Sequence, residues 1–534
     1  MGKSLTKQLT AIDFYSGIGG WSFGFELAGI KIVKSYEWWE PANTTHKKNL
    51  AADAVQVDIR ELDVSTVPHD VDFVIGSPPC TQFSYSNRGG SGNLEDGLQD
   101  IKKFLDIVAS VKPKFWAMEN VPRVAKVIEN EIQPGGVLEQ FSEILTTDMI
   151  HIVDMSDFGL PQRRKRCIVG NFDAKLLMSY TSKCRTKSLG DVLDSLSSSK
   201  VSDPNYTLDM SSNALTDHEK ESVLNWEELR FNRDAKTYHT VYNDMSFPEQ
   251  LDKPVRTVTA TCTRVSRESI IVPEAKNFRR LTIRERGCLQ GFPINYQFFG
   301  PTYSAKMKMI GNAIPPVFTY YLANTFKQTK LDDLVSHEDV KFDFHGASES
   351  APVTPIDTDG KSYPENRSFR FAIPNLRFKS GTRFELSNHS GKLPWSIDFY
   401  YGDSKRIQSL ALNKGIFEAT KAQLSRHNKQ CVNQIEAFLA SAPRIESISL
   451  QSTWSKRTDE THPFVLLDEF GDLAEKIINH VSTVEKHHID DVLLKIFSSQ
   501  SKDSVIIGRA KLLKYSVEIV SGLLIGSSVN AKAV

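Results

Sequence analysis

The sequence predicts a doubly wound α/β fold with a mostly parallel sheet in its N-terminal half. Short apolar runs at residues 9–15, 31–36 and 71–76 are expected to be buried strands, since such runs bounded by turn signals are typical of parallel sheets. Apolar residues with helical spacing follow the first run and return at residues 98–111. The strands end in glycine, proline or an acid, at the sheet edge where open α/β folds place their ligands.

The composition fits a globular protein of several domains. The chain has 534 residues, 40% hydrophobic and 24% charged, which is too long for a single core. Lys and Arg (65) balance Asp and Glu (65), so only a local basic face could attract nucleic acid. Six cysteines without CxxC pairs indicate neither a zinc site nor a disulfide framework, and no apolar run approaches the roughly 18–20 residues of a membrane span. We therefore expect a cytoplasmic protein with reduced thiols, no metal and no membrane contact.

The first strand is expected to end in a glycine-rich turn. Residues 16–20 read Ser-Gly-Ile-Gly-Gly between the strand and an amphipathic helix. Glycines at such a turn let the backbone approach a ligand closely. Taken alone, the pattern is equally compatible with a plain tight turn.

The next two strand ends carry acids. Glu37 lies about 20 residues after the glycines, which is the spacing of a ribose-binding acid in doubly wound folds. Asp58 follows a short apolar segment in the same way. Either acid alone is more often simply solvated, but the ordered set predicts a nucleoside pocket.

Cys80 follows the strand at residues 71–76 through a Gly-Ser-Pro-Pro segment. The prolines cannot continue a ladder, so Cys80 is expected on a stiff loop at the carboxyl end of the strand. A free cysteine is usually a structural one, and this stretch alone leaves a nucleophile and a buried thiol equally open. The polar, glycine-bearing residues 86–97 are long for a loop in a compact domain, which favours a function for them.

Two further strand ends should lie at the same edge. Residues 115–118 predict a buried strand that ends in Glu119, a placement like that of Cys80. The basic run at residues 163–166 leads into another apolar segment. Alternation sends Arg164 and Arg166 to one face, which we expect to point into the cleft.

Taken in order, these motifs resemble the cytosine-5 DNA methyltransferase family over about residues 9–328. Two departures are small: Tyr15 stands where many members have Phe, and Gln82 comes one residue later than in the commonest form. The matching blocks are Asp13-Phe14-Tyr15-Ser16-Gly17-Ile18-Gly19-Gly20, Glu37-Trp38, Asp58-Ile59, Ser77-Pro78-Pro79-Cys80, Glu119-Asn120-Val121, Gln162-x-Arg164-x-Arg166, Arg280-Leu281-Thr282 with Gln290-Gly291-Phe292-Pro293, and Ile310-Gly311-Asn312-Ala313-Ile314-Pro315-Pro316.

The resemblance implies a Rossmann-like domain that transfers a methyl group from S-adenosylmethionine to carbon 5 of a cytosine flipped out of duplex DNA. The Cys80 thiolate would add to carbon 6 and so activate carbon 5. Glu119 would face ring nitrogen 3, with its pKa raised in a closed pocket. Arg164 and Arg166 would hold the base carbonyl or a phosphate and favour the thiolate.

The resemblance also implies a cofactor pocket. Glu37 would take the ribose hydroxyls and Asp58 the adenine amino group, while the glycine turn approaches the amino acid part. Trp38, Ile59 and Tyr15 would pack the adenine. The full expected set is Asp13, Tyr15, Gly17, Gly19, Gly20, Glu37, Trp38, Asp58, Ile59, Pro78 and Asn312.

Residues 176–278 correspond to the family's target-recognition region, and residues 252–260 resemble the segment that contacts DNA beside the flipped base. Residues 81–97 are placed to fill the gap that a flipped base leaves. For each arginine, a plain surface position is the alternative. The expected DNA contacts are Gln82, Ser84, Arg256, Thr257, Arg264 and Arg267.

The predicted domain order ends in an appended module. We expect a catalytic core at residues 1–175, target recognition at 176–278, a return to the catalytic domain at 279–335, a linker at 336–366 and an α+β domain at 367–534, with helices at 416–442 and 469–497. The module interleaves basic and aromatic residues near its start, so DNA contact, partner docking and plain stabilisation all remain open. His462, His487 and His488 have no metal-like spacing.

The leading hypothesis is a sequence-specific DNA (cytosine-5-)-methyltransferase that acts on double-stranded DNA as a monomeric catalytic unit. It would protect self DNA beside a nuclease of a restriction-modification or phage-defence system, in a prokaryotic cytoplasm near the nucleoid. A tRNA cytosine-5 methyltransferase of the same fold is the nearest rival, and the size of the middle segment favours DNA. An exocyclic-amino methyltransferase would need an aromatic residue at Cys80. A non-catalytic DNA-binding regulator would not need every reacting group that the chain carries.

Overall fold

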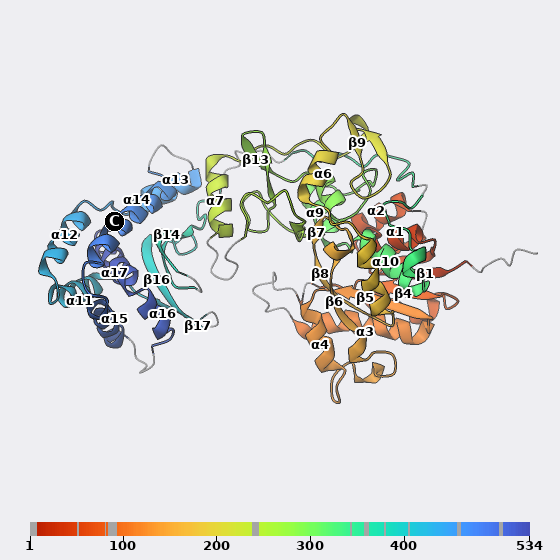
Figure 1. Cartoon of the computed structure of the whole chain (residues 1–534), viewed down its shortest axis with the longest axis horizontal. Coiled ribbons are helices and arrows are strands. Elements are labelled where there is room, and N and C mark those ends of the chain that lie inside the picture. Colours follow the sequence, from red (N-terminus) through yellow and green to blue (C-terminus); the bar gives the residue numbers. More distant parts are fainter. Residues whose placement is uncertain are drawn as a thin grey trace, which may run out of the picture. The chain divides into compact units, whose positions relative to one another are not determined.

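The computed structural model describes residues 8–50, 53–80, 82–83, 93–237, 245–341, 344–356, 363–378, 381–392, 394–403, 406–456, 461–500 and 506–533. The chain divides into two compact units (Figure 1). The first contains Met1–Leu229 and Pro248–Thr358, and the second contains Arg230–Phe247 and Asp359–Val534. Each unit is described below by itself.

The first unit is built on a seven-stranded sheet of order β3-β2-β1-β4-β5-β8-β6. The strands from β3 to β5 are mutually parallel, and β8 runs antiparallel between β5 and β6. The order changes direction between β1 and β4, which creates a crevice at the carboxyl ends of these strands. This confirms the predicted doubly wound, mostly parallel sheet. The strands are β1 (Thr10–Phe14), β2 (Lys31–Glu37), β3 (Ala54–Gln56), β4 (Phe73–Gly76), β5 (Phe115–Asn120), β6 (Ile150–Asp154) and β8 (Lys165–Gly170).

Helices cover both faces of this sheet, because successive strand residues point to opposite sides. On one face Phe73 of β4 stacks on Phe326 of α10 (Pro316–Phe326), with ring centroids 5.3 Å apart. On the other face Trp116 of β5 lies 6.2 Å from Phe104 of α3 (Leu94–Val111). Figure 1 shows α10, from far along the chain, beside α1 (Gly20–Leu27). The C-terminal part of the predicted catalytic domain therefore packs on its first helix.

The first unit also contains a short strand pair just before β8 and several further helices and strands. The strand β11 pairs in parallel with β7, so Val255–Arg256 lie beside Gln162–Arg163. Part of the predicted linker packs on this unit, since the Ala351 N–H donates to Gln297 Oε1 at 3.0 Å. The other helices and strands are α2 (Glu40–Asn49), α4 (Arg123–Glu131), α5 (Ala174–Ser179), α6 (Leu189–Ser195), β9 (Lys200–Ser202), β10 (Asp209–Ser211), β12 (Ile271–Glu274), β13 (Asn277–Arg280), α8 (Ile283–Leu289) and α9 (Tyr303–Asn312).

The second unit combines a four-stranded antiparallel sheet with helices around one apolar core. The residues of α7 (Trp226–Thr237) from Arg230 onward belong to it. Its other elements are β14 (Arg370–Arg377), β15 (Arg383–Ser387), β16 (Ser396–Asp403), β17 (Arg406–Leu410), α11 (Lys414–Ser425), α12 (Lys429–Ala440), α13 (Ser447–Lys456), α14 (Pro463–Val481), α15 (Lys486–Gln500), α16 (Arg509–Lys514) and α17 (Ser516–Asn530). The appended α+β architecture agrees with the prediction, with helix content predominating.

The two long helices predicted in this unit are each interrupted. The helix expected at residues 416–442 is split into α11 and α12, because the Asn428 side chain accepts from Cys431 N and caps a new helix. The region from residue 463 to residue 500 likewise holds α14 and α15 in place of one helix. Over the residues that the structure describes, every helix is too short or too polar to cross a membrane.

Candidate active site

A cavity of about 450 Å³ opens at the carboxyl edge of the sheet in the first unit. Cys80, just beyond β4, lines it together with Glu119, Arg164 and Arg166. The predicted reacting groups are therefore brought together with most of the predicted cofactor residues. Those lining the same cavity are Tyr15, Gly17, Glu37, Trp38, Asp58, Ile59, Pro78 and Asn312.

Glu119 and Arg166 form an ion pair beside Cys80. The antiparallel pairing of β5 with β8 places Asn120 opposite Cys167, which brings the two charged side chains to the same end. Arg166 Nε lies 2.8 Å from Glu119 Oε1, with side-chain exposures of 13% and 7%. A charge-assisted hydrogen bond this short, in a mostly dry setting, fixes the orientation of both groups. Asn120 connects β5 to the loop that carries Cys80, since its Nδ2 donates to the Pro78 carbonyl at 3.1 Å.

The Cys80 thiol is half-buried, and its pKa is raised above the usual value. Burial is the main cause, because it disfavours the charged thiolate, and the Glu119 carboxylate adds to it. Arg166 and Arg164 lower the pKa, as the sequence led us to expect, but burial outweighs them. The thiol therefore needs further help to ionise near neutral pH.

Arg164 makes different contacts from Arg166. Its guanidinium is buried and donates to the backbone carbonyls of Gly311 (2.9 Å), Ala313 (3.0 Å) and Val258 (3.3 Å). Burial lowers the pKa of Arg164 to about 9, with the positive charge of Arg166 acting in the same direction. These contacts fasten three segments together at the cavity wall. A role for Arg164 in holding the base stays a prediction.

The glycine turn is organised by Glu37. One carboxylate oxygen accepts from Gly17 N at 2.9 Å and the other from Trp39 N at 2.8 Å. Gly17 has φ of +55° and open space where a Cβ would lie, on the cavity side. At Gly20 a Cβ would overlap the Ile314 carbonyl, so this glycine permits close packing of the chain. Gly19 and Gly20 do not line the cavity.

Asp13 lies beneath this turn and not on the cavity wall. It is fully buried, and its Oδ2 accepts from Ser22 Oγ at 2.7 Å. Burial raises the pKa of Asp13 to about 8. Its expected contact with the cofactor stays a prediction.

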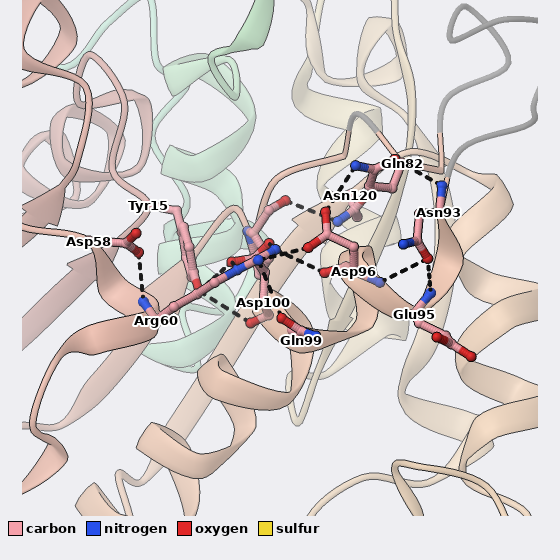
Figure 2. A network of polar contacts seen from close by, with 11 residues as sticks. Tyr15, Asp58, Arg60, Gln82, Asn93, Glu95, Asp96, Gln99, Asp100 and Asn120 are labelled. Atoms are coloured by element: carbon pink, nitrogen blue, oxygen red, sulfur yellow. Dashed lines mark hydrogen bonds and ion pairs between the residues drawn. The ribbon is translucent and has the colours of Figure 1, made fainter.

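A polar network that we did not predict continues the cavity wall (Figure 2). Arg60 reaches from beside Asp58 to Asp96 and Asp100 on α3. Tyr15 joins the network through its hydroxyl, 3.3 Å from Asp100 Oδ1. The available signal was the place of Arg60, directly after the Asp58-Ile59 motif.

The residues predicted to contact DNA lie in several settings. Gln82 is held by Asn93 N (3.0 Å) and by Asp96 (2.9 Å), and Ser84 lies outside the described residues. Thr257 Oγ1 donates at 2.8 Å to the carbonyl of Arg163, the residue before the cavity-lining Arg164. The predicted arginines pair with acids: Arg256 with Glu249 (2.8 Å), Arg264 bidentately with Glu228 (2.7 and 2.9 Å) and Arg267 with Glu268 (2.8 Å). Their contacts with DNA stay predictions.

The histidines of the second unit also have defined settings. The His462 ring accepts from Phe464 N at 3.2 Å and caps α14. Glu485, His487 and His488 bring one ligand atom each within 4.8 Å of one another on an exposed surface, a grouping that their spacing did not indicate. The absence of a metal site stays a prediction.

Comparisons with known proteins identify the family of this chain. Residues 9–328 match the family model described as C-5 cytosine-specific DNA methylase. The type II methyltransferase M.FnuDI of Fusobacterium nucleatum is 27% identical over 341 residues, covering 60% of this chain and 95% of that protein. M.HgiDI of Herpetosiphon aurantiacus is 29% identical over 328 residues, covering 60% and 94%. A DNA modification methyltransferase encoded in an E. coli prophage has a solved structure with a TM-score of 0.44, 22% identity and coverage of 60% and 99%. Since the family model covers more than half of the sequence, the chain belongs to the C-5 cytosine-specific DNA methylase family.

Proposed function

We propose that this chain methylates carbon 5 of cytosine at a specific duplex DNA sequence, with Cys80 as the nucleophile and S-adenosylmethionine as the methyl donor. The observation that carries the proposal is the meeting of Cys80 with the Glu119–Arg166 ion pair, in one cavity with Gly17 and Glu37. Family membership supplies the substrate class, and the cavity supplies the residues for the chemistry.

The residues of the cavity fit S-adenosylmethionine. Gly17 leaves room for close approach, and Glu37 and Asp58 offer carboxylates to hydroxyl and amino groups. Trp38 is 58% exposed on the cavity wall and so is free to pack against a flat ring. Tyr15, Ile59, Pro78 and Asn312 would complete the enclosure. When bound, the cofactor supplies a methyl group on a positively charged sulfur.

The protein's part in the chemistry begins with Cys80. Its thiolate forms a bond to carbon 6 of cytosine, and the electron pair displaced from the carbon 5–carbon 6 double bond makes carbon 5 nucleophilic. Once carbon 5 carries the methyl group, its proton leaves to water or a base. The electrons of that carbon–hydrogen bond restore the double bond and expel the Cys80 thiolate.

Glu119 is placed to stabilise the negative charge that develops on the cytosine ring. Because Arg166 holds one of its oxygens, the other can face ring nitrogen 3. To donate a hydrogen bond to that nitrogen, Glu119 must be protonated. The proton must be taken up before the cytosine enters the cavity or together with it. Arg166 then stabilises the carboxylate that remains after the proton has moved.

A carbon inside the base stack is out of reach of a thiol at the cavity wall, so the target cytosine must be flipped out. Unstacking costs a few kcal/mol, which contacts with the displaced strand and the unpaired partner base have to offset. Thr257 contacts Arg163, which directly precedes the cavity-lining Arg164, so both are candidates for such contacts.

We further propose a role in protecting self DNA from a nuclease, in a restriction-modification or phage-defence system of a prokaryotic cell. The support is that similar proteins are type II methyltransferases, whose lengths this chain spans almost fully. We propose a monomeric catalytic unit.

The proposal is tested by methyl transfer from tritiated S-adenosylmethionine to two acceptors, PCR-amplified bacterial genomic DNA and bulk tRNA. We expect label in duplex DNA that is absent with Cys80→Ala. Bisulfite sequencing of the same DNA should then show 5-methylcytosine at one short sequence. Label in tRNA alone would favour the RNA rival, and DNA binding without label in either acceptor would favour a non-catalytic regulator.

A further inference from the structure

All the N–H donors of the Arg60 guanidinium bond to acceptors in one turn of helix α3. Its Nε and Nη2 grip the Asp100 carboxylate at 2.9 and 2.6 Å, and its Nη1 reaches Asp96 Oδ1 at 2.8 Å. The Asp96 carbonyl and Gln99 Oε1 accept the remaining donors at 2.9 and 3.3 Å. A guanidinium has five N–H donors, so every one of them is engaged. Such a fork fixes the angle of the helix turn, which a single point charge would not do.

At one end this cluster forms the wall of the proposed adenosine pocket. The Arg60 N–H donates to Asp58 Oδ1 at 3.0 Å, so the backbone of Arg60 orients the acid proposed to meet adenine. On the far side of Arg60, Asp100 accepts from the Tyr15 hydroxyl. All of these residues line the same cavity as Cys80.

At the other end the cluster holds the chain just after the nucleophile (Figure 2). The second oxygen of Asp96 accepts from Gln82 Nε2 at 2.9 Å, and Gln82 Oε1 accepts from Asn93 N at 3.0 Å. The next residue, Phe83, is fully buried, and a Cβ at Gly97 would lie 2.6 Å from its ring. Gln82 and Phe83 thus pack on the same helix turn that Arg60 binds.

We propose that Arg60 is a positioning residue that, through Asp96, sets Gln82, two residues after Cys80, relative to the adenosine end of the cofactor pocket. This inference rests on the proposed function. In this arrangement Gln82 serves the alignment of Cys80 and not the binding of DNA. Arg60 takes part in two tasks, the shape of the cofactor pocket and the placement of the thiol, whereas Gln82 takes part only in the second.

The test is a kinetic comparison of Arg60→Lys, Gln82→Leu and the double variant with the wild-type chain, at saturating duplex DNA. Lysine keeps a charge beside the buried Asp100 carboxylate, which protects folding, but loses the fork. We expect Gln82→Leu to lower kcat about tenfold or more, because a misplaced nucleophile is costly, with KM for S-adenosylmethionine unchanged. Arg60→Lys should lower kcat and also raise that KM by about threefold or more.

The double variant and a matched control make the test specific. Because both changes break one chain of contacts, the double variant should have a kcat within about twofold of Gln82→Leu. The control is Glu95→Gln, a charge change on the same helix turn whose side chain is exposed and outside the Arg60 cluster, and both constants should stay at the wild-type value. Thermal melting of every variant checks that it is folded.

Two results would overturn the inference: a kcat of Gln82→Leu equal to wild type, or reductions that multiply in the double variant. In the first case, a raised KM for DNA, measured by varying DNA at saturating cofactor, would indicate that Gln82 contacts DNA. If the wild-type chain transfers no methyl group, the proposed function fails, and calorimetry with S-adenosylhomocysteine still tests the inference. Arg60→Lys should then bind it more weakly and Gln82→Leu equally well, and equal affinities would contradict the role of Arg60.

Discussion

The charges around Cys80 oppose one another. Burial and the Glu119 carboxylate raise the pKa of the thiol, while Arg166 and Arg164 lower it. A cysteine attacks as its thiolate, so under the proposed mechanism the free chain holds most of its Cys80 in the unreactive thiol form near neutral pH. This balance has a direct kinetic consequence.

The rate of the chemical step should rise with pH. Below its pKa, the thiolate fraction of Cys80 grows about tenfold per pH unit, so the single-turnover rate of methyl transfer should climb steadily between about pH 6.5 and pH 8.5. Rapid-quench measurement with tritiated cofactor checks this. A rate that is flat or falling across that range would mean that ionisation of Cys80 does not limit the reaction.

Asp13 gives a stability prediction with a definite sign. Its pKa is about 8 in the folded chain against an ordinary 3.8, so the folded state holds a proton that the unfolded state has lost between these values. Stability should therefore fall as pH rises through that window. Asp13→Asn removes the titration and keeps an acceptor for Ser22. We expect the Tm of the variant to fall less than that of the wild type between about pH 5 and pH 8, and equal falls would contradict the assignment.

At the scale of single residues, some residues of the cavity can be predicted from the sequence and others cannot. The meeting of Cys80, Glu119 and Glu37 in one cavity was predictable because each lies at or shortly after the end of an apolar strand, and parallel strand ends meet at one edge. The Arg60–Asp100 pair is not predictable, because it joins the residue after the Asp58-Ile59 motif to one face of a helix 40 residues later, and local sequence does not encode that contact. Nor do motifs show that Arg164 binds backbone carbonyls while Arg166 binds Glu119.

At the scale of elements, strands with strong apolar runs were predicted well and short ones poorly. The strand β3 has only 3 residues, too few to show a periodicity. Its position was indicated only by Asp58, which follows the short apolar segment. The position of β8 between β5 and β6 depends on long-range pairing that local sequence does not encode. The breaks in the two long helices of the second unit depend on caps such as Asn428, which a wide apolar pattern masks.

Gly311 joins two elements that are distant in sequence. A Cβ there would overlap the backbone of Thr259 and Ala260, so Gly311→Ala must push apart the last turn of α9 and the predicted DNA-contacting segment. We expect a loss of about 1–3 kcal/mol in the free energy of unfolding, measured by urea denaturation, together with reduced methyl transfer. In the control Gly415→Ala, the Cβ would approach only the tip of the Asn413 side chain, and stability should hold. Equal stabilities for the two variants would contradict the close contact.

At the scale of the whole molecule, the second unit is not a simple C-terminal addition. Residues Arg230–Phe247, from within the predicted recognition region, belong to it. Arg230 pairs bidentately with Asp468 at 2.7 and 2.6 Å, and Phe231 packs edge-on against Phe371 with centroids 5.0 Å apart. The predicted boundary at residue 367 follows composition, and composition does not reveal a segment contributed from elsewhere in the chain.

Because Arg230–Phe247 belong to the second unit, we expect a substitution in that segment to destabilise the second unit. Phe231→Ala removes a ring from the surface of β14 and should cost about 1–3 kcal/mol locally. Hydrogen exchange of peptides from β14 and α14 should speed up, while peptides from β1 and β4 exchange as in the wild type. Unchanged exchange in β14 and α14 would contradict the assignment of Arg230–Phe247 to this unit.

The most direct measurement of the central claim is trapping of the sulfur–carbon bond. Duplex DNA carrying 5-fluorocytosine at the sequence mapped by bisulfite should form a denaturation-resistant complex with the wild-type chain and S-adenosylmethionine, because fluorine cannot leave as the carbon 5 proton does. Mass spectrometry should place the adduct on Cys80, and Cys80→Ala should form none while still binding S-adenosylhomocysteine. An adduct that persists in Cys80→Ala, or no adduct from a wild-type chain that methylates ordinary DNA, would contradict nucleophilic attack by Cys80.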